Sequence, residues 1–240
     1  INLIDEGNTI PFIARYRKEM HGTMDDTVLR GLAERLTYLR NLDTRRQEVK
    51  TAIAAQDKLT DALCADIDAA QTLAEVEDLY RPYKQKRRTR ATIAKDKGLE
   101  PLAMTLLEQR RDLPDISTLA ESYIDAEKGV ETADDALAGA SDIIAEIVSD
   151  SADIRRRLRE LITVQGLIGS AAAKEEDSVY SLYYQFSQPV SRLQGHQILA
   201  INRGEKEGFL KVSLDIDRER ALGVVCGAIV KPGSAASDFV

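Results

Sequence analysis

Aliphatic residues recur every three, four or seven positions through much of this chain, and this spacing is the strongest constraint on its fold. One face of an α-helix repeats every 3.6 residues, so the spacing predicts helices that each bury one side. A buried arginine needs a partner, so we expect Arg46, which interrupts the clearest run, to turn outward or to lie at an interface. The apolar positions of that run, over residues 29–53, are Leu29, Leu32, Leu36, Leu39, Leu42, Val49 and Ile53.

Composition favours the same fold. Aromatic residues make up 5% of the 240 residues, tryptophan is absent, and the chain has only 14 Gly and 6 Pro. Strands are enriched in aromatic and β-branched residues, so this composition disfavours a sandwich or a barrel. We therefore predict a mainly α fold, an elongated multi-helix assembly. At most a small β element is expected, at residues 167–173 and 209–216, where the second segment alternates as a strand does.

Capping residues mark several expected helix starts. Thr60 and Thr72 each precede a short apolar-patterned stretch, and Glu75 follows Thr72 at the spacing of a capping box. These signals predict helices that begin after residues 60 and 72. Further helices are expected over residues 132–150 and 153–165.

We expect three regions along the chain. Residues 1–165 form a helical N-terminal region, residues 166–216 a helix-turn-helix-like part with short strands, and residues 217–240 a helical tail. In the second region, two helices joined across Pro189 give the helix-turn-helix outline. Its inward positions are expected to be Leu182, Leu193, Ile198, Leu199 and Ile201.

Few residues are available for disulfide or metal chemistry. Cys64 and Cys226 lie far apart, and we expect both to be buried thiols in a reducing cytosol. His21 and His196 show no ligand spacing, so no metal site and no cofactor is expected. The longest apolar stretch, residues 221–230, is well short of the roughly 20 residues of a membrane span. We therefore expect a cytoplasmic chain without a membrane partner.

Catalytic motifs are absent from the sequence. It contains no G-x-S-x-G, no phosphate-binding P-loop and no G-x-G-x-x-G. One expected helix face carries four carboxylates that are able to hold Mg²⁺ if they converge, but a solvated acidic face is the commoner reason for such a stripe. We therefore expect that this chain is not an enzyme. The four carboxylates are Asp142, Glu146, Asp150 and Asp153.

A basic segment stands out against the overall charge of −7. Residues 81–97 hold eight basic residues and a single acid, Asp96. Such a site on an acidic body can face a phosphate backbone, an acidic protein surface or solvent, and spacing alone leaves all three open. Tyr80 and Tyr83 alternate with the cations and offer stacking faces, and Tyr83 is the better candidate because Tyr80 is also expected in the core. The candidate nucleic-acid-binding residues are Arg81, Tyr83, Lys84, Lys86, Arg87, Arg88 and Arg90.

Two further segments supply weaker basic candidates. In residues 10–19 three cations interleave with Phe12 and Tyr16, and the simpler interpretation is a basic helix face that packs through its aromatics. Cations near the second helix of the expected helix-turn-helix would contact a DNA groove, unless that unit serves packing alone. Four arginines within residues 155–159 are expected to form a solvated face with acidic neighbours. The secondary candidates are Arg15, Arg17, Lys18, Arg192 and Arg203.

Four segments carry a family resemblance. They are IDEGNTIPFIARYRKE, ERLTYLRNLDTRR, EVEDLYRPYKQKRRTRATIAKDKGLEPLA and YYQFSQPVSRLQGHQILAINRGEKEGFLKV. Together they resemble the N-terminal region of Tex, the bacterial family of transcription accessory proteins. The resemblance extends over nearly the whole chain, from Ile4 to about Val212, and is more specific than any single motif.

The resemblance implies a role in transcription. Tex-like proteins are related to a eukaryotic elongation factor that travels with RNA polymerase, so RNA or DNA and RNA polymerase are the implied partners. The family pattern is a helical N-terminal region with a helix-turn-helix-like part. It continues with a ribonuclease H-type domain, a helix-hairpin-helix region and an OB-fold RNA-binding domain. The ribonuclease-like domain is not regarded as a working nuclease, which again argues against an enzyme.

This sequence departs from the family pattern because none of the downstream domains follows. It also lacks Met at position 1, and we expect it to be a piece of a longer protein. The resemblance therefore implies a helical scaffold that supports nucleic-acid binding, with most binding in the parts absent here. The alternative is a protein-docking module, for example to RNA polymerase, that makes no nucleic-acid contact of its own.

Overall fold

A computed structural model describes residues 1–22, 24–85, 87–174 and 176–240. Helices dominate it, and its β structure is one small sheet, so the prediction of a mainly α fold is confirmed. The chain divides into two compact units, unit 1 (Ile1–Tyr83) and unit 2 (Lys84–Val240). This division lies inside the region expected as residues 1–165, and the three expected regions stay a prediction.

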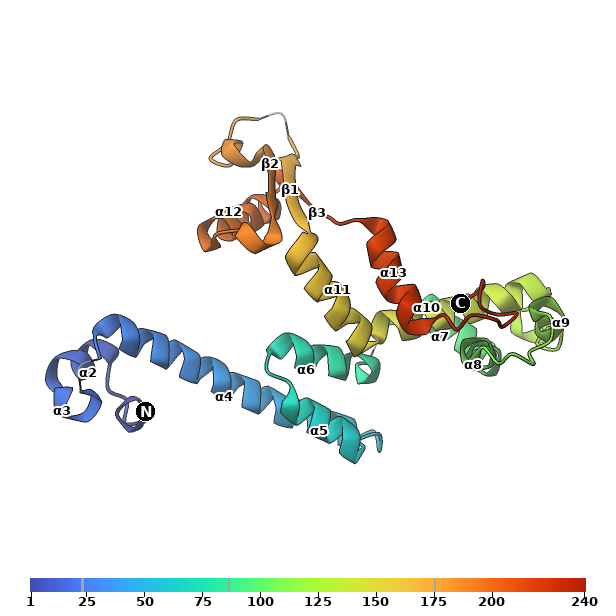
Figure 1. Cartoon of the computed structure of the whole chain (residues 1–240), viewed down its shortest axis with the longest axis horizontal. Helices are drawn as coiled ribbons and strands as arrows, with labels where there is room; N and C mark the ends of the chain where they lie inside the picture. Colours follow the sequence, from blue (N-terminus) through green and yellow to red (C-terminus); the bar gives the residue numbers. More distant parts are fainter. Residues whose placement is uncertain (23, 86, 175) are drawn as a thin grey trace. The chain divides into compact units, whose positions relative to one another are not determined.

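Unit 1 is organised along one long helix, α4 (Asp26–Ala54), with short helices packed near each of its ends (Figure 1). Asp25 caps its N-terminus by accepting a hydrogen bond from the Val28 amide. The short elements are α1 (Asn2–Asp5), α2 (Ile10–Tyr16), α3 (Lys18–His21), α5 (Asp61–Ala69), α6 (Leu73–Tyr80) and the 3₁₀ turn η1 (Arg81–Tyr83).

Helix α4 serves two separate small cores. Leu29 packs with Leu3 and Ile13 in the first, and Leu42, Val49 and Ile53 pack with residues of α5 and α6 in the second. The apolar spacing of residues 29–53 therefore predicted the helix correctly. Leu39 nevertheless stays 44% exposed, because an amphipathic face is buried only where another element covers it.

Arg46 interrupts the apolar run for a structural reason. Its Nη2 donates a hydrogen bond to the carbonyl oxygen of Ala70, the C-cap residue of α5. The last carbonyls of a helix lack partners within the helix, and a cation near them is also favoured by the helix dipole. Arg46 therefore connects α4 to the end of α5. The Ala70 carbonyl is a hydrogen-bond partner of the kind that a partly buried arginine requires.

Helix α10 (Ala133–Asp150) is the centre of the main core of unit 2. It packs against α7 (Arg90–Asp96), α8 (Glu100–Glu108) and α9 (Ile116–Glu121). The remaining helical elements of unit 2 are η2 (Ala126–Lys128), α11 (Ala152–Gln165), η3 (Ser181–Tyr183), η4 (Val190–Arg192), α12 (Gly195–Lys206) and α13 (Arg218–Ile229).

A three-stranded antiparallel sheet follows α11 in unit 2 (Figure 1). Its order is β2 (Gln185–Pro189), β1 (Leu167–Ala172) and β3 (Leu210–Asp215). Ser170 is paired with Phe186 on one side and with Val212 on the other. Helix α12 packs beside β3, with Ile201 and Leu210 buried. The strands expected within residues 167–173 and 209–216 are therefore confirmed.

The prediction of a first helix in the helix-turn-helix is wrong. Residues 181–183 form the 3₁₀ turn η3, and residues 185–189 form strand β2. The apolar spacing there also suits a strand, and pairing with the central strand β1 gives the backbone partners that a local helix would otherwise supply. Only the second expected helix forms, as α12, so a strand and a short turn precede it where a helix was expected.

The inward positions expected for that unit are also partly wrong. Ile201 is buried, whereas Leu182 is 86%, Leu199 73% and Ile198 43% exposed. Without a first helix beside it, α12 buries only the face that meets the sheet.

Helix α13 buries less than its sequence suggests. It contains most of the longest apolar stretch, yet none of its described residues is fully buried. Cys226 on this helix is exposed and Cys64 on α5 is half-buried, so the expectation of two buried thiols is wrong. Both thiols are free. No helix in the described ranges combines the length and the apolarity that crossing a membrane requires.

The burial of α12 can be tested at two neighbouring positions. Leu199→Ala should change the free energy of unfolding by no more than about 0.5 kcal/mol, because the side chain is already in solvent. Ile201→Ala should cost about 2–4 kcal/mol, because it leaves a cavity against the sheet. Urea denaturation followed by far-UV circular dichroism measures both, and equal losses would contradict this placement of α12.

The close packing of α10 predicts a difference between two helical glycines. A Cβ at Gly139 would lie 2.3 Å from Cδ1 of Leu99, a buried side chain, whereas one at Gly223 on α13 would meet no described atom within 4 Å apart from its chain neighbours and its own helix backbone. Gly139→Ala should therefore destabilise unit 2 by about 1–3 kcal/mol through overpacking. Gly223→Ala should stabilise it by about 0.5–1 kcal/mol, because alanine is the better helix former. Urea denaturation followed by far-UV circular dichroism measures both changes. An increase in the free energy of unfolding for Gly139→Ala would contradict the close packing of Leu99 against α10.

Candidate nucleic-acid interface

The basic segment connects the two compact units along the chain. Arg81 and Tyr83 belong to η1 at the end of unit 1, and Lys84 is the first residue of unit 2. Lys86, one of the candidate residues, lies outside the described residues. Each unit therefore contributes its own part of the segment.

The aromatic candidate is partly used by the fold. Tyr83 is half-buried, and its ring packs against the core around Leu42 and Ile67, as does that of Tyr80. The backbone carbonyl of Tyr83 accepts a hydrogen bond of 3.0 Å from Nε2 of Gln56. Packing against unit 1 thus leaves only part of the Tyr83 ring in solvent, where a base could stack on it.

Arg87, Arg88 and Arg90 are exposed and close together in sequence. Within the described part of the chain, Arg87 and Arg88 form no ion pair. The Arg90 side chain is 86% exposed, and its Nε lies 3.4 Å from Oδ1 of Asp142. By contrast, Arg81 and Lys84 are engaged in other interactions of the fold. Arg87, Arg88 and Arg90, which we call the Arg87–Arg90 cluster, hold the most available positive charge among the described residues of the segment.

Thr89 fixes where the Arg87–Arg90 cluster meets helix α7. Its Oγ1 accepts a hydrogen bond of 3.0 Å from the Thr92 amide and so caps the helix. The same hydroxyl lies 3.0 Å from Oε1 of Glu146 on α10, to which it donates. The beginning of α7 is therefore attached to α10, and the arginines on either side of Thr89 extend from a fixed point.

The four carboxylates that the sequence places at residues 142–153 lie on α10 and α11, and each of them interacts with its own neighbours. Asp142 meets Arg90, Glu146 accepts from Thr89, and Asp150 is buried and also engaged. Asp153 accepts from Arg156 at 2.6 Å and from Arg157 at 2.8 Å. Nowhere in the described ranges do three or more metal-ligating side chains gather. The geometry is one of separate contacts and not of a carboxylate cage.

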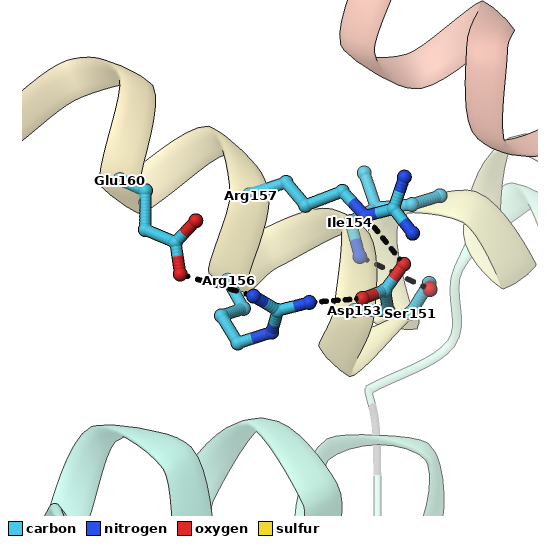
Figure 2. A network of polar contacts seen from close by, with 6 residues as sticks. All are labelled: Ser151, Asp153, Ile154, Arg156, Arg157 and Glu160. Atoms are coloured by element: carbon cyan, nitrogen blue, oxygen red, sulfur yellow. Dashed lines mark hydrogen bonds and ion pairs between the residues drawn. The ribbon is translucent and has the colours of Figure 1, made fainter.

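Figure 2 shows the start of α11, where the arginine run meets its acidic neighbours. The Ser151 hydroxyl caps the helix by accepting from the Ile154 amide, and Arg156 bridges Asp153 and Glu160. The hydrogen bond from Arg156, together with that from Arg157, holds the pKa of the Asp153 carboxyl below its usual value. The expectation of a solvated arginine face with acidic neighbours is confirmed for Arg156 and Arg157, whereas Arg155 and Arg159 are half-buried.

The secondary candidates lie on other elements. Arg15 and Lys18 are exposed on α2 and α3, and Arg17 between them is paired with Glu19 at 2.8 Å. Arg192 on η4 and Arg203 on α12 are exposed as well. None of these five cations lies on the basic segment, residues 81–97, that carries the Arg87–Arg90 cluster.

Sequence reasoning missed an exposed aromatic pair. Phe12 and Tyr16 were expected to pack inward, yet they are 42% and 62% exposed, with ring centroids 5.4 Å apart. Ile13 occupies the buried side of α2 instead. The spacing already indicated this exposure. Phe12 and Tyr16 are four residues apart and share one face of the helix, whereas Ile13 lies on another face.

Comparison with known proteins identifies two matching family models. Residues 1–54 match the Tex-like protein N-terminal domain, and residues 113–231 match the model described as Tex central region-like.

Curated relatives match over about nine-tenths of this chain. The Bacillus subtilis protein YdcI is 48% identical over 219 residues, which are 90% of this chain and 30% of the relative. The transcriptional accessory protein Tex of Neisseria gonorrhoeae is 42% identical over 217 residues, 89% of this chain and 28% of the relative. The human S1 RNA-binding domain-containing protein 1 is 31% identical over 226 residues, which are 90% of this chain and 22% of the relative. The chain thus spans less than a third of the length of each of these relatives.

The Asp153 network predicts a pH-dependent contribution to stability. A carboxyl whose pKa is lower in the folded than in the unfolded state stabilises the fold above its unfolded pKa, and that contribution is lost as the pH falls through the folded pKa. Asp153→Asn should therefore lower the Tm near about pH 7, and the difference from wild type should be smaller at about pH 3, because the contribution is lost as the pH falls through the lowered pKa of the Asp153 carboxyl.

Thermal unfolding at both pH values measures this effect. Glu205→Gln is the matched control, because the Glu205 carboxylate is exposed on α12 and forms no ion pair with any described residue. A Tm difference for Asp153→Asn that is equally large at both pH values would show that the carboxylate charge is not its cause.

Proposed function

Because the chain belongs to the Tex family, we propose that it forms a helical scaffold of a transcription accessory factor and contacts RNA or DNA through its Arg87–Arg90 cluster. The proposed contact supports nucleic-acid binding by other parts of the longer protein, and it is not the main nucleic-acid-binding site of that protein. Cytoplasmic localisation is part of the same proposal.

The observation that carries this proposal is the availability of charge in the cluster. Arg87 and Arg88 are exposed and form no ion pair within the described residues, whereas Arg156 holds two carboxylates. Like charges this close repel one another unless counter-charge is supplied. A phosphate backbone supplies it, and guanidinium groups match phosphate oxygens in a two-pronged geometry.

The names of relatives support the transcription and nucleic-acid parts of the proposal. The Neisseria gonorrhoeae relative is named a transcriptional accessory protein, and the human relative is named for an S1 RNA-binding domain. Both are much longer than this chain, so RNA binding by the whole factor is proposed here by analogy with them.

A docking role without nucleic-acid contact, for example to RNA polymerase, is the competing proposal. It is favoured by internal counter-charge beside the segment, since Asp142 of α10 already partly neutralises Arg90. If this internal counter-charge suffices, the cluster is part of the scaffold.

We also propose a binding and not a catalytic role. What supports it is that Asp142, Glu146 and Asp153 each engage a separate neighbour of the fold. A general acid, a general base or a metal site would instead need these carboxylates to converge on one point.

The test is a titration of this chain with labelled single- and double-stranded RNA and DNA, followed by fluorescence anisotropy at several salt concentrations. Replacing Arg87, Arg88 and Arg90 together by Ala should weaken binding by about tenfold or more. It should also reduce the salt slope by roughly two to three, about one for each phosphate that the variant no longer neutralises.

A matched control removes three other exposed cations, Lys58, Arg111 and Lys211, which lie far apart in the sequence. It changes the net charge equally but should leave the salt slope nearly unchanged. Equal slopes for the cluster variant and wild type would reject nucleic-acid contact by the cluster. A lower Tm of the cluster variant at unchanged binding would favour the scaffold role instead.

A further inference from the structure

Helices α2 and α3 expose three large apolar side chains. Phe12 is 42%, Tyr16 62% and Met20 60% exposed. Residues 12, 15 and 16 share one side of α2, because positions three and four apart are neighbours on a helix. We name Phe12, Arg15, Tyr16, Lys18 and Met20 the α2–α3 surface. Its three apolar members lie within nine residues, and this concentration is more than the single exposed apolar residues that are normal on a protein surface.

The local core holds α2 and α3 in place beneath this surface. Ile13, which points the other way, is 2% exposed and packs with Leu3 and Leu29. The imidazole Nε2 of His21 in α3 lies 3.1 Å from the carbonyl oxygen of Ile13, so α3 is attached to α2. The exposure of Phe12, Tyr16 and Met20 therefore comes from the folded arrangement of two helices.

The charges of this surface are positive and available. Arg15 and Lys18 are exposed, and neither forms an ion pair with any residue that the structure describes. Arg17 is neutralised by Glu19 at 2.8 Å, so Arg15 and Lys18 remain as the unpaired cations among the described residues of α2 and α3. A partner that fits must bury the apolar groups and bring negative charge.

We propose that the α2–α3 surface is a docking site for an acidic protein segment that carries aromatic or aliphatic side chains. Phe12, Tyr16 and Met20 contact its apolar side chains, and aromatic residues and Met are typical of interface centres. Arg15 and Lys18 at the edge pair with its carboxylates, which speeds association and selects acidic partners. This site is separate from the Arg87–Arg90 cluster and does not depend on the proposed nucleic-acid contact.

A protein segment fits this surface better than a nucleic acid does. The rings of Phe12 and Tyr16 are tilted by 43° against each other, so they do not form a continuous stacking platform. Met20 adds a thioether that suits irregular apolar side chains and offers no base contact. Only two free cations remain, which is few for a backbone-binding site.

The experiment uses the whole chain and labelled peptides of roughly 12 residues, about three helical turns. One peptide set combines Asp and Glu with Leu and Phe. The comparison sets keep only the acidic residues, keep only the apolar residues, or replace the acids by Lys. Fluorescence anisotropy should show the tightest binding for the acidic apolar set, and this binding should weaken with added salt because exposed charges are screened.

Two variants of the surface test the two kinds of contact. Phe12→Ser with Tyr16→Ser should weaken binding of the acidic apolar peptides by about tenfold or more. Arg15→Glu with Lys18→Glu keeps the apolar groups and should reverse the preference toward the Lys-containing peptides. Because Arg15 and Lys18 are exposed, this second variant keeps the test valid if loss of both aromatics disturbs folding.

Matched controls separate this proposal from general stickiness and from nucleic-acid binding. Val164→Ser with Leu182→Ser removes two apolar side chains of unit 2 that are 71% and 86% exposed, and it should bind the peptides as wild type does. The variant lacking Arg87, Arg88 and Arg90 should also bind them normally. The proposal is overturned if the surface variants bind like wild type, if Lys-containing peptides bind wild type equally well, or if oligo(dT) displaces the acidic peptides.

Discussion

Helix α10 is the element around which unit 2 is built, because small residues on it let other helices approach closely. Ala136 and Ala140 are fully buried, and Gly139 leaves room for the side chain of Leu99. Close approach buries apolar area on α7, α8 and α9 at once, and buried apolar area is the main source of stability. The same packing brings the start of α7 beside Asp142 and Glu146, so the core also positions Thr89 and Arg90 of the basic segment.

The charges of unit 2 fall into two different arrangements. At the start of α11, Arg156 and Arg157 lie one turn from Asp153, and the helix itself supplies their partners. Around the start of α7, Arg87 and Arg88 precede the helix and form no ion pair with a described residue, whereas Arg90, its first residue, lies near Asp142. Local spacing neutralises the first group, whereas the second keeps an excess of positive charge. This difference, and not the number of arginines, makes the Arg87–Arg90 cluster the better candidate for a polyanion.

Several helices of this chain bury only part of their apolar surface. Leu39 on α4, Leu199 on α12 and Phe12 on α2 are all more than two-fifths exposed, and α13 has no fully buried residue among those described. In unit 1, short elements and two separate cores explain this, because each core covers only a few turns of α4. Such exposed faces suit a scaffold whose surfaces take part in larger assemblies.

The sequence by itself determined helices such as α4, α5 and α6, because their signals act over a few residues. Apolar spacing predicted α4, and Thr60 and Thr72 predicted the starts of α5 and α6, since capping bonds join residues two or three apart. Tertiary structure alone decided that residues 185–189 pair with β1, that Arg46 reaches Ala70, and which apolar positions stay exposed. These outcomes depend on elements distant in sequence, and a spacing pattern names the apolar face of a helix but not what covers it.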